Sequence, residues 1–166
     1  MTHPYILSAL RTLEIESNAL IHLKSSINQV FVDVVTLFCS TKGRVIVMGM
    51  GKSGHIGKKI AATLSSTGTP SFFVHPAEAS HGDLGMITPL DVVLAISNSG
   101  EAEELNVLLP HLKRMQIPIV ALTSNASSTL GTHSDFFIST HVESEACPLN
   151  LAPTASTTAQ LAIGDA

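Results

Sequence analysis

The chain has 166 residues, of which 45% are apolar and 13% charged, and its formal net charge is −4. This length fits one domain with a substantial buried core, and the composition excludes a disordered chain. The nine Lys and Arg residues are scattered without a basic run, which argues against a nucleic-acid partner.

The cysteines and the N-terminus bear on the compartment. Cys39 and Cys147 are the only cysteines, and neither stands in a C-x-x-C pair or another metal-ligand spacing. We therefore expect a reduced, cytoplasmic environment. The segment Met1–Glu16 lacks a basic start followed by an apolar stretch, so no secretory signal is predicted. No apolar run approaches ~18 residues, so no membrane span is predicted, and the low share of charged residues favours an oligomer.

Two helical patterns occupy the N-terminal part of the chain, residues 1–42. Apolar residues recur every three or four positions over residues 27–38, and a weaker stripe of the same kind covers Ile6–Leu23. We predict an N-terminal helical hairpin that packs on a sheet or on another subunit.

From residue 43 onward, short apolar runs alternate with helix-like stretches. Strands that are apolar on both faces and separated by helices indicate a parallel sheet covered on each side. The prediction is a doubly wound α/β core over residues 43–166, which forms one domain, 1–166, with the N-terminal helices. The predicted strands are Arg44–Met48, Ser71–Val74, Val92–Ile96, Ile117–Leu122 and Asp135–Ile138, and the predicted helices are Gly54–Ser66, Ala102–Met115, Ser127–Gly131 and one starting near Thr154.

A glycine-rich segment, Gly49–Gly54, follows the first predicted strand and opens a helix. It matches G-x-G-x-x-G, but no acidic residue ends the second strand, where a dinucleotide-binding fold would hold a ribose. A P-loop would need glycine where the chain has Ile46. Both patterns share an anion-binding turn at a helix N-terminus, and we predict that role for Gly51 and Ser53. A tight turn without a ligand is the alternative.

A second polar turn, Ser97–Glu101, follows the third predicted strand and precedes another helix. Its hydroxyl, amide and glycine groups would form a second anion cradle, although ordinary helix capping is the alternative. Ligands bind beyond the carboxyl ends of parallel strands, so two such turns on successive strand ends favour a phosphorylated ligand. The residues concerned are Ser97, Asn98, Ser99 and Gly100.

Titratable groups gather in the polar segment His75–Asp83, after the second predicted strand. Glu104, near the start of a predicted helix, and Glu145 are further acid or base candidates. A glutamate in a first helical turn is more often a solvated residue that complements the helix dipole. The spacing between His75 and His81 does not by itself make a metal site.

Five segments of the chain together form a pattern that one enzyme family shares. They are Val47–Gly57, Gly68–Pro76, His81–Met86, Ser97–Glu101 and Glu145–Leu149. In these segments the chain resembles the sugar isomerase (SIS) domain of bacterial D-arabinose 5-phosphate isomerases. The resemblance runs from about Gly43 to Ala166, whereas the N-terminal helices match only in pattern.

The resemblance implies a five-stranded parallel sheet, the SIS fold, and a homotetramer with sites between subunits. It also implies interconversion of D-ribulose 5-phosphate and D-arabinose 5-phosphate, a step toward 3-deoxy-D-manno-octulosonate of lipopolysaccharide or capsule. Carried over by position, the functional residues are Lys52, His81, Glu104 and Glu145, with a non-essential, inhibitory zinc contact at His75. The substrate-binding positions are Gly51, Ser53, Gly68, Thr69, Ser97, Asn98, Ser99 and Gly100.

The chain departs from the family pattern in three places. Relatives usually continue past Ala166 into a longer helix and a His-Pro-Gly-Gly segment whose histidine belongs to the active site. Most also carry a pair of CBS modules, which this sequence does not contain. The phosphate loop normally ends in a hydroxyl residue where this chain has Ala102, which we expect to weaken phosphate binding.

The expected chemistry moves a carbonyl between C1 and C2 of a sugar and requires no redox cofactor or metal. Glu145 or Glu104 would act as the base, and the sequence does not choose between them. Lys52 would neutralise negative charge or hold the phosphate, and His81 would handle a hydroxyl proton or ring opening. Two rival functions are a non-catalytic sugar-phosphate sensor and a nucleotide-binding enzyme.

Overall fold

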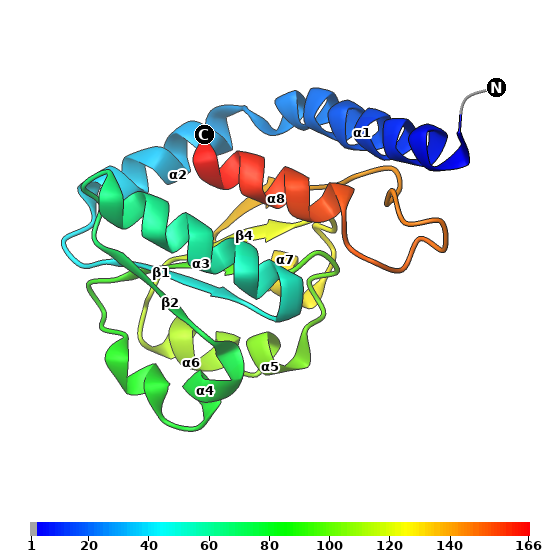
Figure 1. Cartoon of the computed structure of the whole chain (residues 1–166). Helices are drawn as coiled ribbons and strands as arrows, with labels where there is room; N and C mark the ends of the chain where they lie inside the picture. The colour runs from blue at the N-terminus through cyan, green and yellow to red at the C-terminus, as the bar shows by residue number, and fades with distance from the viewer. Residues whose placement is uncertain (1–2) are drawn as a thin grey trace.

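The computed structural model describes residues 3–166; Met1 and Thr2, in the predicted N-terminal unit, lie outside the described residues. Helices and strands alternate through most of the chain (Figure 1). In chain order the elements are α1 Pro4–Leu23, η1 Lys24–Ser26, α2 Gln29–Ser40, β1 Val45–Gly49, α3 Gly51–Ser66, β2 Ser71–Val74, α4 Pro76–Ser80, η2 Asp83–Met86, β3 Val92–Ile96, α5 Glu103–Asn106, α6 Leu109–Arg114, β4 Ile119–Thr123, α7 Thr129–His133, β5 Phe136–Ser139 and α8 Ala155–Asp165.

The strands form one sheet in which every neighbouring pair is parallel, with the order β2-β1-β3-β4-β5. The doubly wound, five-stranded parallel sheet predicted from the sequence is therefore confirmed. β2 and β3 have the predicted bounds, and the other three strands begin and end one or two residues later than predicted. Their Val, Ile and Phe content suits a pleated, buried surface.

Successive residues of a strand face opposite sides of the sheet, so the central strands feed two separate cores. Ile46 and Met48 of β1 pack in the core beneath α4, α5, α6 and α7. Val45 and Val47 pack in the core beneath α2, α3 and α8. Figure 1 shows these two groups of helices on opposite sides of the sheet. Both faces of β1 are buried, which explains its continuous apolar run.

The two predicted N-terminal helices are present, but they do not form the predicted hairpin. The 3₁₀ turn η1 leads from α1 into α2 without bringing them side by side, and Figure 1 shows α2 continuing beyond the end of α1. The two helices pack on different elements: α1 packs against α8, and α2 packs against β5. Within residues 3–166, no helix combines the length and apolar character needed to cross a bilayer.

The single helix predicted over Ala102–Met115 is wrong, since the structure has the two short helices α5 and α6 there. Pro110 lies in the first turn of α6. A proline has no N–H to donate and its ring collides with the preceding turn, so it cannot continue a helix that began at Glu103. α5 ends at Asn106. The side-chain Nδ2 of this residue donates to the Gly100 carbonyl oxygen at 3.2 Å.

Candidate active site

The site lies at the carboxyl edge of the sheet, where the chain leaves β1 and β3. These two strands are neighbours, and Gly49, the last residue of β1, pairs with Ile96, the last residue of β3. The helix after β1 covers one face of the sheet, whereas the helices after β3 cover the other face. Strand order reverses at this point, which opens a crevice where ligands bind in doubly wound folds. The two predicted anion-binding turns therefore start about 4.8 Å apart.

The first turn carries α3 away from β1 in a conformation that glycine favours. Gly51 has φ +52°. A Cβ on Gly49 would lie 3.0 Å from the Ile96 carbonyl oxygen and 3.1 Å from the Ser53 backbone. α3 has 16 residues, and its residue before the first turn, Met50, offers no side-chain cap. The first amides of α3 thus have no partner of their own and can donate to a phosphate.

Two predicted side chains start on this turn. Lys52 is exposed and forms no ion pair within residues 3–166, so its ammonium is free to meet a negative ligand. Ser53 is half-buried, and its Oγ donates to Gln160 Oε1 at 3.1 Å. Gln160 was not predicted, because it lies on α8, far along the sequence.

The second turn, Ser97–Glu101, is held by the connection between β4 and α7. The Asn98 carbonyl oxygen accepts hydrogen bonds from Thr123 Oγ1 (3.1 Å), Ser124 N (3.0 Å) and Ser124 Oγ (2.6 Å). The Gly100 carbonyl oxygen accepts from Leu130 N at 3.0 Å. These bonds fix the carbonyl side of the turn. Sequence reasoning missed the donors, since only pairing of β3 with β4 brings them here.

The turn can lie this close to the β4–α7 connection because residue 100 is glycine, and a larger residue would not fit there. The φ of Gly100 is +71°, and a Cβ would lie 2.0 Å from Ser128 Oγ. The hydroxyls of the turn also have a clear arrangement, since Ser97 Oγ accepts from Gly100 N (3.1 Å) and Ser99 Oγ accepts from Glu101 N (3.2 Å). Each hydroxyl oxygen accepts a hydrogen bond from a backbone N–H of the same turn and donates its own proton to no other group in residues 3–166. Both protons are available for a phosphate oxygen.

The acid and base candidates His81 and Glu104 lie on elements that touch. His81 ends α4 and Glu104 is in the first turn of α5, and these two helices pack against each other. Both side chains are exposed. Because α4 and α5 follow β2 and β3, both residues lie on the carboxyl side of the sheet with the two turns.

Glu145 has a different environment, at the N-terminus of α8. Its Oε2 accepts hydrogen bonds from Thr154 N (2.7 Å), Thr154 Oγ1 (2.9 Å) and Ser156 N (3.2 Å). Burial raises the pKa of this carboxyl, but the hydrogen bonds from Ser156 and Thr154 outweigh it, and the pKa lies below the ordinary 4.5. A carboxylate held in this way is a weaker base than a free one. The sequence did not choose between Glu104 and Glu145 as the base. In the structure they differ, because Glu145 is hydrogen-bonded at the start of α8 whereas Glu104 is exposed.

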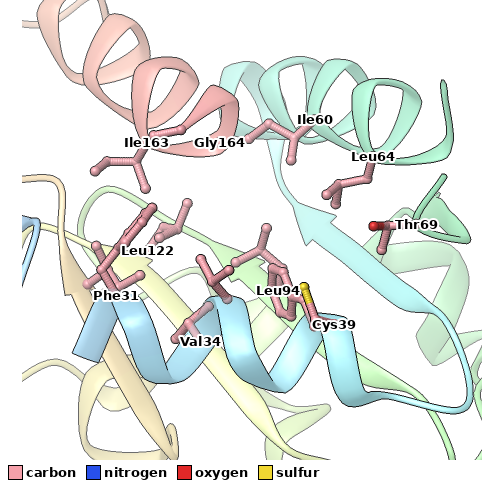
Figure 2. Close-up of a pocket in the computed structure, with 14 residues that line it drawn as sticks. Phe31, Val34, Cys39, Ile60, Leu64, Thr69, Leu94, Leu122, Ile163 and Gly164 are labelled. Atoms are coloured by element: carbon pink, nitrogen blue, oxygen red, sulfur yellow. The ribbon is translucent and has the colours of Figure 1, made fainter. Parts of the chain in front are cut away.

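Two predicted substrate-binding residues are not brought to this edge. Gly68 and Thr69 lie just before β2, at the amino edge of the sheet. They end α3, since Gly68 has φ +101° and Thr69 N donates to the Leu64 carbonyl oxygen at 2.9 Å. Thr69 also lines an apolar cavity of about 200 Å³ between α2, α3 and α8 (Figure 2). None of the other predicted site residues lines that cavity.

His75 stands alone as a metal candidate. It follows β2 directly and is the N-cap of α4, and its Nδ1 is buried without a hydrogen-bond partner in the described residues. Within residues 3–166, no three His, Cys, Asp or Glu side chains gather closely enough to hold a metal ion.

The cap on α8 predicts an acid-sensitive contribution to stability. Because the folded pKa of Glu145 is lowered, its contribution is full above pH 4.5 and is lost as the pH falls through the folded pKa. Glu145→Gln keeps an acceptor but removes the charge, so we expect a loss of about 1 kcal/mol at pH 7. Urea unfolding at pH 7 and in acid measures this difference, which should shrink in acid.

Glu143→Gln is the matched control, because Glu143 is exposed and makes only a 3.6 Å contact with His22. Equal stability of the Glu145→Gln variant and the parent chain at pH 7 would show that the carboxylate does not hold α8.

Known proteins share much of this sequence and its fold. The sequence model described as SIS domain matches residues 37–166. The arabinose 5-phosphate isomerase KdsD of Pseudomonas aeruginosa is 57% identical over 162 residues, which cover 98% of this chain and 50% of that protein. KdsD of Escherichia coli strain K12 is 56% identical over 158 residues, covering 93% of this chain and 47% of that protein. The chain thus spans about half the length of these curated relatives.

A solved structure extends the comparison to three dimensions. The structure of E. coli CFT073 c3406 in complex with arabinose 5-phosphate is 41% identical in sequence and has a TM-score of 0.93. The match covers 99% of this chain and 88% of that chain. The family match over most of the chain and the shared five-stranded parallel fold lead to one conclusion: this chain belongs to the SIS-domain family.

Proposed function

We propose that the protein is an aldose-ketose isomerase that interconverts D-ribulose 5-phosphate and D-arabinose 5-phosphate. The observation that carries the proposal is the pair of anion-binding turns at neighbouring strand ends, with a lysine and a glutamate on the helices that follow them. The identity to relatives named arabinose 5-phosphate isomerase and the similarity to the c3406 complex with arabinose 5-phosphate support this substrate.

The phosphate would be held between the turns. The amides that open α3 face it from one side, and the free hydroxyl protons of Ser97 and Ser99 reach it from the other. Lys52 adds a positive charge at the same edge. Fixing the phosphate in this way orients the sugar chain for the proton transfer.

Glu104 would be the base of the isomerisation. It takes a proton from the carbon beside the carbonyl, the carbonyl oxygen gains a proton, and an enediol results. The former carbonyl carbon then gains a proton while the other enediol hydroxyl loses its proton, so the carbonyl has moved by one carbon and no external oxidant or reductant is consumed. Lys52 would stabilise the developing oxyanion, and His81 would move a hydroxyl proton or open the sugar ring. Glu145 would act as a support for α8 beside this chemistry.

The reaction as proposed requires no cofactor, and zinc at His75 would act as an inhibitor. A single histidine with an unpartnered Nδ1 could give such an ion one protein ligand. We further propose that the enzyme works in the cytoplasm, in the synthesis of lipopolysaccharide or capsule. The absence of redox or membrane chemistry from the proposed reaction is compatible with that setting.

We also propose a homotetramer with sites between subunits. α1 presents an apolar stripe to solvent, made of residues spaced four, three and seven positions apart on one helix face. Leu10 and Leu13 are 57% and 62% exposed, which is unusual for two neighbouring leucines on one helix face. A second copy would cover this stripe. The residues of the apolar stripe are Ile6, Leu10, Leu13 and Leu20.

The activity test is incubation of the purified chain with ribulose 5-phosphate and detection of arabinose 5-phosphate. Glu104→Gln should lower kcat at least ~10²-fold while arabinose 5-phosphate still binds, because the base is lost and the phosphate cradle is kept. Glu103→Gln, the neighbouring exposed glutamate of α5, is the control and should keep the parent rate. A parent-like rate in Glu104→Gln would show that Glu104 is not the base.

Binding of arabinose 5-phosphate without turnover in the parent chain would instead indicate the alternative function, a non-catalytic sugar-phosphate sensor.

The missing hydroxyl at Ala102 gives a separate prediction. Ala102 is the N-cap of α5 and makes no side-chain cap hydrogen bond. Ala102→Ser supplies a cap and a hydroxyl donor beside the phosphate, so it should raise the Tm and tighten arabinose 5-phosphate binding about tenfold. Calorimetric titration measures the Kd, with Ala126→Ser in an exposed loop as control. An unchanged Kd would mean that the phosphate does not reach this residue.

The apolar stripe on α1 predicts the oligomeric state. The double change Leu10→Glu and Leu13→Glu places charges on the surface that the second copy would bury, so the tetramer should dissociate while the α/β core stays folded. Light scattering after size exclusion measures the mass, and circular dichroism checks the fold. Glu14→Gln, on the same exposed helix, should leave the mass unchanged. A parent-like mass for the double variant would place the interface elsewhere.

A further inference from the structure

The hydroxyl of Ser53 differs from the other hydroxyls of the phosphate-binding turns. Ser97 and Ser99 accept hydrogen bonds from their own turn and keep their protons free. Ser53 instead gives its proton away, to Gln160 Oε1 at 3.1 Å. In this arrangement Ser53 can offer a phosphate only lone pairs, which repel a dianion. The proton must therefore turn away from Gln160 before Ser53 can donate to a phosphate.

Gln160 is a fully buried side chain with an unused donor. Its exposed fraction is 0%, and its Nε2 has no partner within residues 3–166. One turn earlier on the same face of α8, Ser156 is also fully buried; its Oγ makes no hydrogen bond of normal geometry, although it lies near enough to the Glu145 carboxylate to lower the pKa of that group. A buried donor without an acceptor is destabilising, so packing alone does not account for a glutamine here.

The helices hold this carboxamide in place. α8 lies close to α3, and a Cβ on Gly164 would come within 2.2 Å of Ile60 Cδ1. Figure 2 shows Ile60 reaching toward Gly164 across the gap between these helices. Gln160 is fully buried beside this close approach, so rotation of its terminal amide is the smallest change that would alter its contact with Ser53. The oxygen and nitrogen of that amide have nearly the same size, so the rotation exchanges an acceptor for a donor at one position.

We propose that Gln160 is a positioning residue of the phosphate site, which sets the direction of the Ser53 hydroxyl. In the free protein the carboxamide oxygen accepts the Ser53 proton. When a phosphate is bound, the amide turns, Nε2 donates to Ser53 Oγ, and the Ser53 proton points at a phosphate oxygen. The rotation gives Nε2 a partner in place of Oε1, and the Ser53 proton gains a charged acceptor in place of a neutral one. The inference rests on the proposed function, because it names a helper of the same phosphate site.

The test is a double-mutant cycle between Ser53→Ala and Gln160→Leu, read as the Kd for arabinose 5-phosphate and, in parallel, for inorganic phosphate. Gln160→Leu removes both the donor and the acceptor, so the Kd should rise roughly two- to tenfold, the worth of one neutral hydrogen bond. In the Ser53→Ala background the same change should have no further effect. Gln160→Glu can only accept and adds a negative charge, so its Kd should rise at least about tenfold.

Three readouts separate positioning from simple packing. The Tm of Gln160→Leu should equal or exceed that of the parent chain, because an unpaired buried donor is removed. KM should rise while kcat stays unchanged, since the phosphate is held alike in the ground and transition states. Ser156→Ala, which removes the other buried hydroxyl without touching Ser53, should leave the Kd unchanged. A lower Tm with a parent-like Kd, or independent effects of the two substitutions, would overturn the proposal.

The two probes keep this proposal distinct from the proposed function. A parent chain that binds inorganic phosphate but not arabinose 5-phosphate would refute the sugar assignment, and the cycle could still be measured with phosphate. A parent chain that binds both, with a Kd that Gln160→Leu does not change, would refute the role of Gln160 alone. Binding of neither probe would refute both.

Discussion

The parallel pairing of β1 with β3 is the constraint on which the site depends. It places Gly49 beside Ile96, so that one turn leaves toward α3 while its neighbour leaves toward α5 on the other face. A slip of one residue in this pairing would turn each buried side chain to the opposite core and move the two turns apart. Because both strands are buried on both faces, the register is specified by packing on two sides at once. The geometry of the candidate site is therefore a consequence of the hydrophobic core.

Hydrogen bonds at this edge divide into those that hold the protein and those left for a ligand. The carbonyl oxygens of Asn98 and Gly100 are occupied by donors from beyond β4, whereas the hydroxyl protons of Ser97 and Ser99 remain free. The hydrogen bonds of Glu145 belong to the first group, because its carboxylate accepts from the amides at the start of α8. Such prior ordering lowers the entropy that a ligand must lose on binding. The acid and base candidates His81 and Glu104, by contrast, are exposed.

Local patterns predicted the strands of the core well and failed at one helix break and at the N-terminal helices. The strand runs were read correctly because Val, Ile and Phe on both faces of a strand have no other stable environment. The long helix over Ala102–Met115 failed at Pro110, a signal that the sequence did contain. The N-terminal hairpin failed for another reason. An apolar stripe shows that a helix has a partner but not which one, and α8 took the place next to α1.

The sequence by itself determined the layered sheet, the two polar turns at strand ends and the SIS family, because these depend on periodicity and on motifs of a few consecutive residues. Only the tertiary structure placed Gly68 and Thr69 at the opposite edge, gave Glu145 its capping role and joined Ser53 to Gln160. Those outcomes are contacts between residues distant in sequence. Their partners become neighbours only after the strands have paired and the helices have covered the sheet, so no local pattern can encode them.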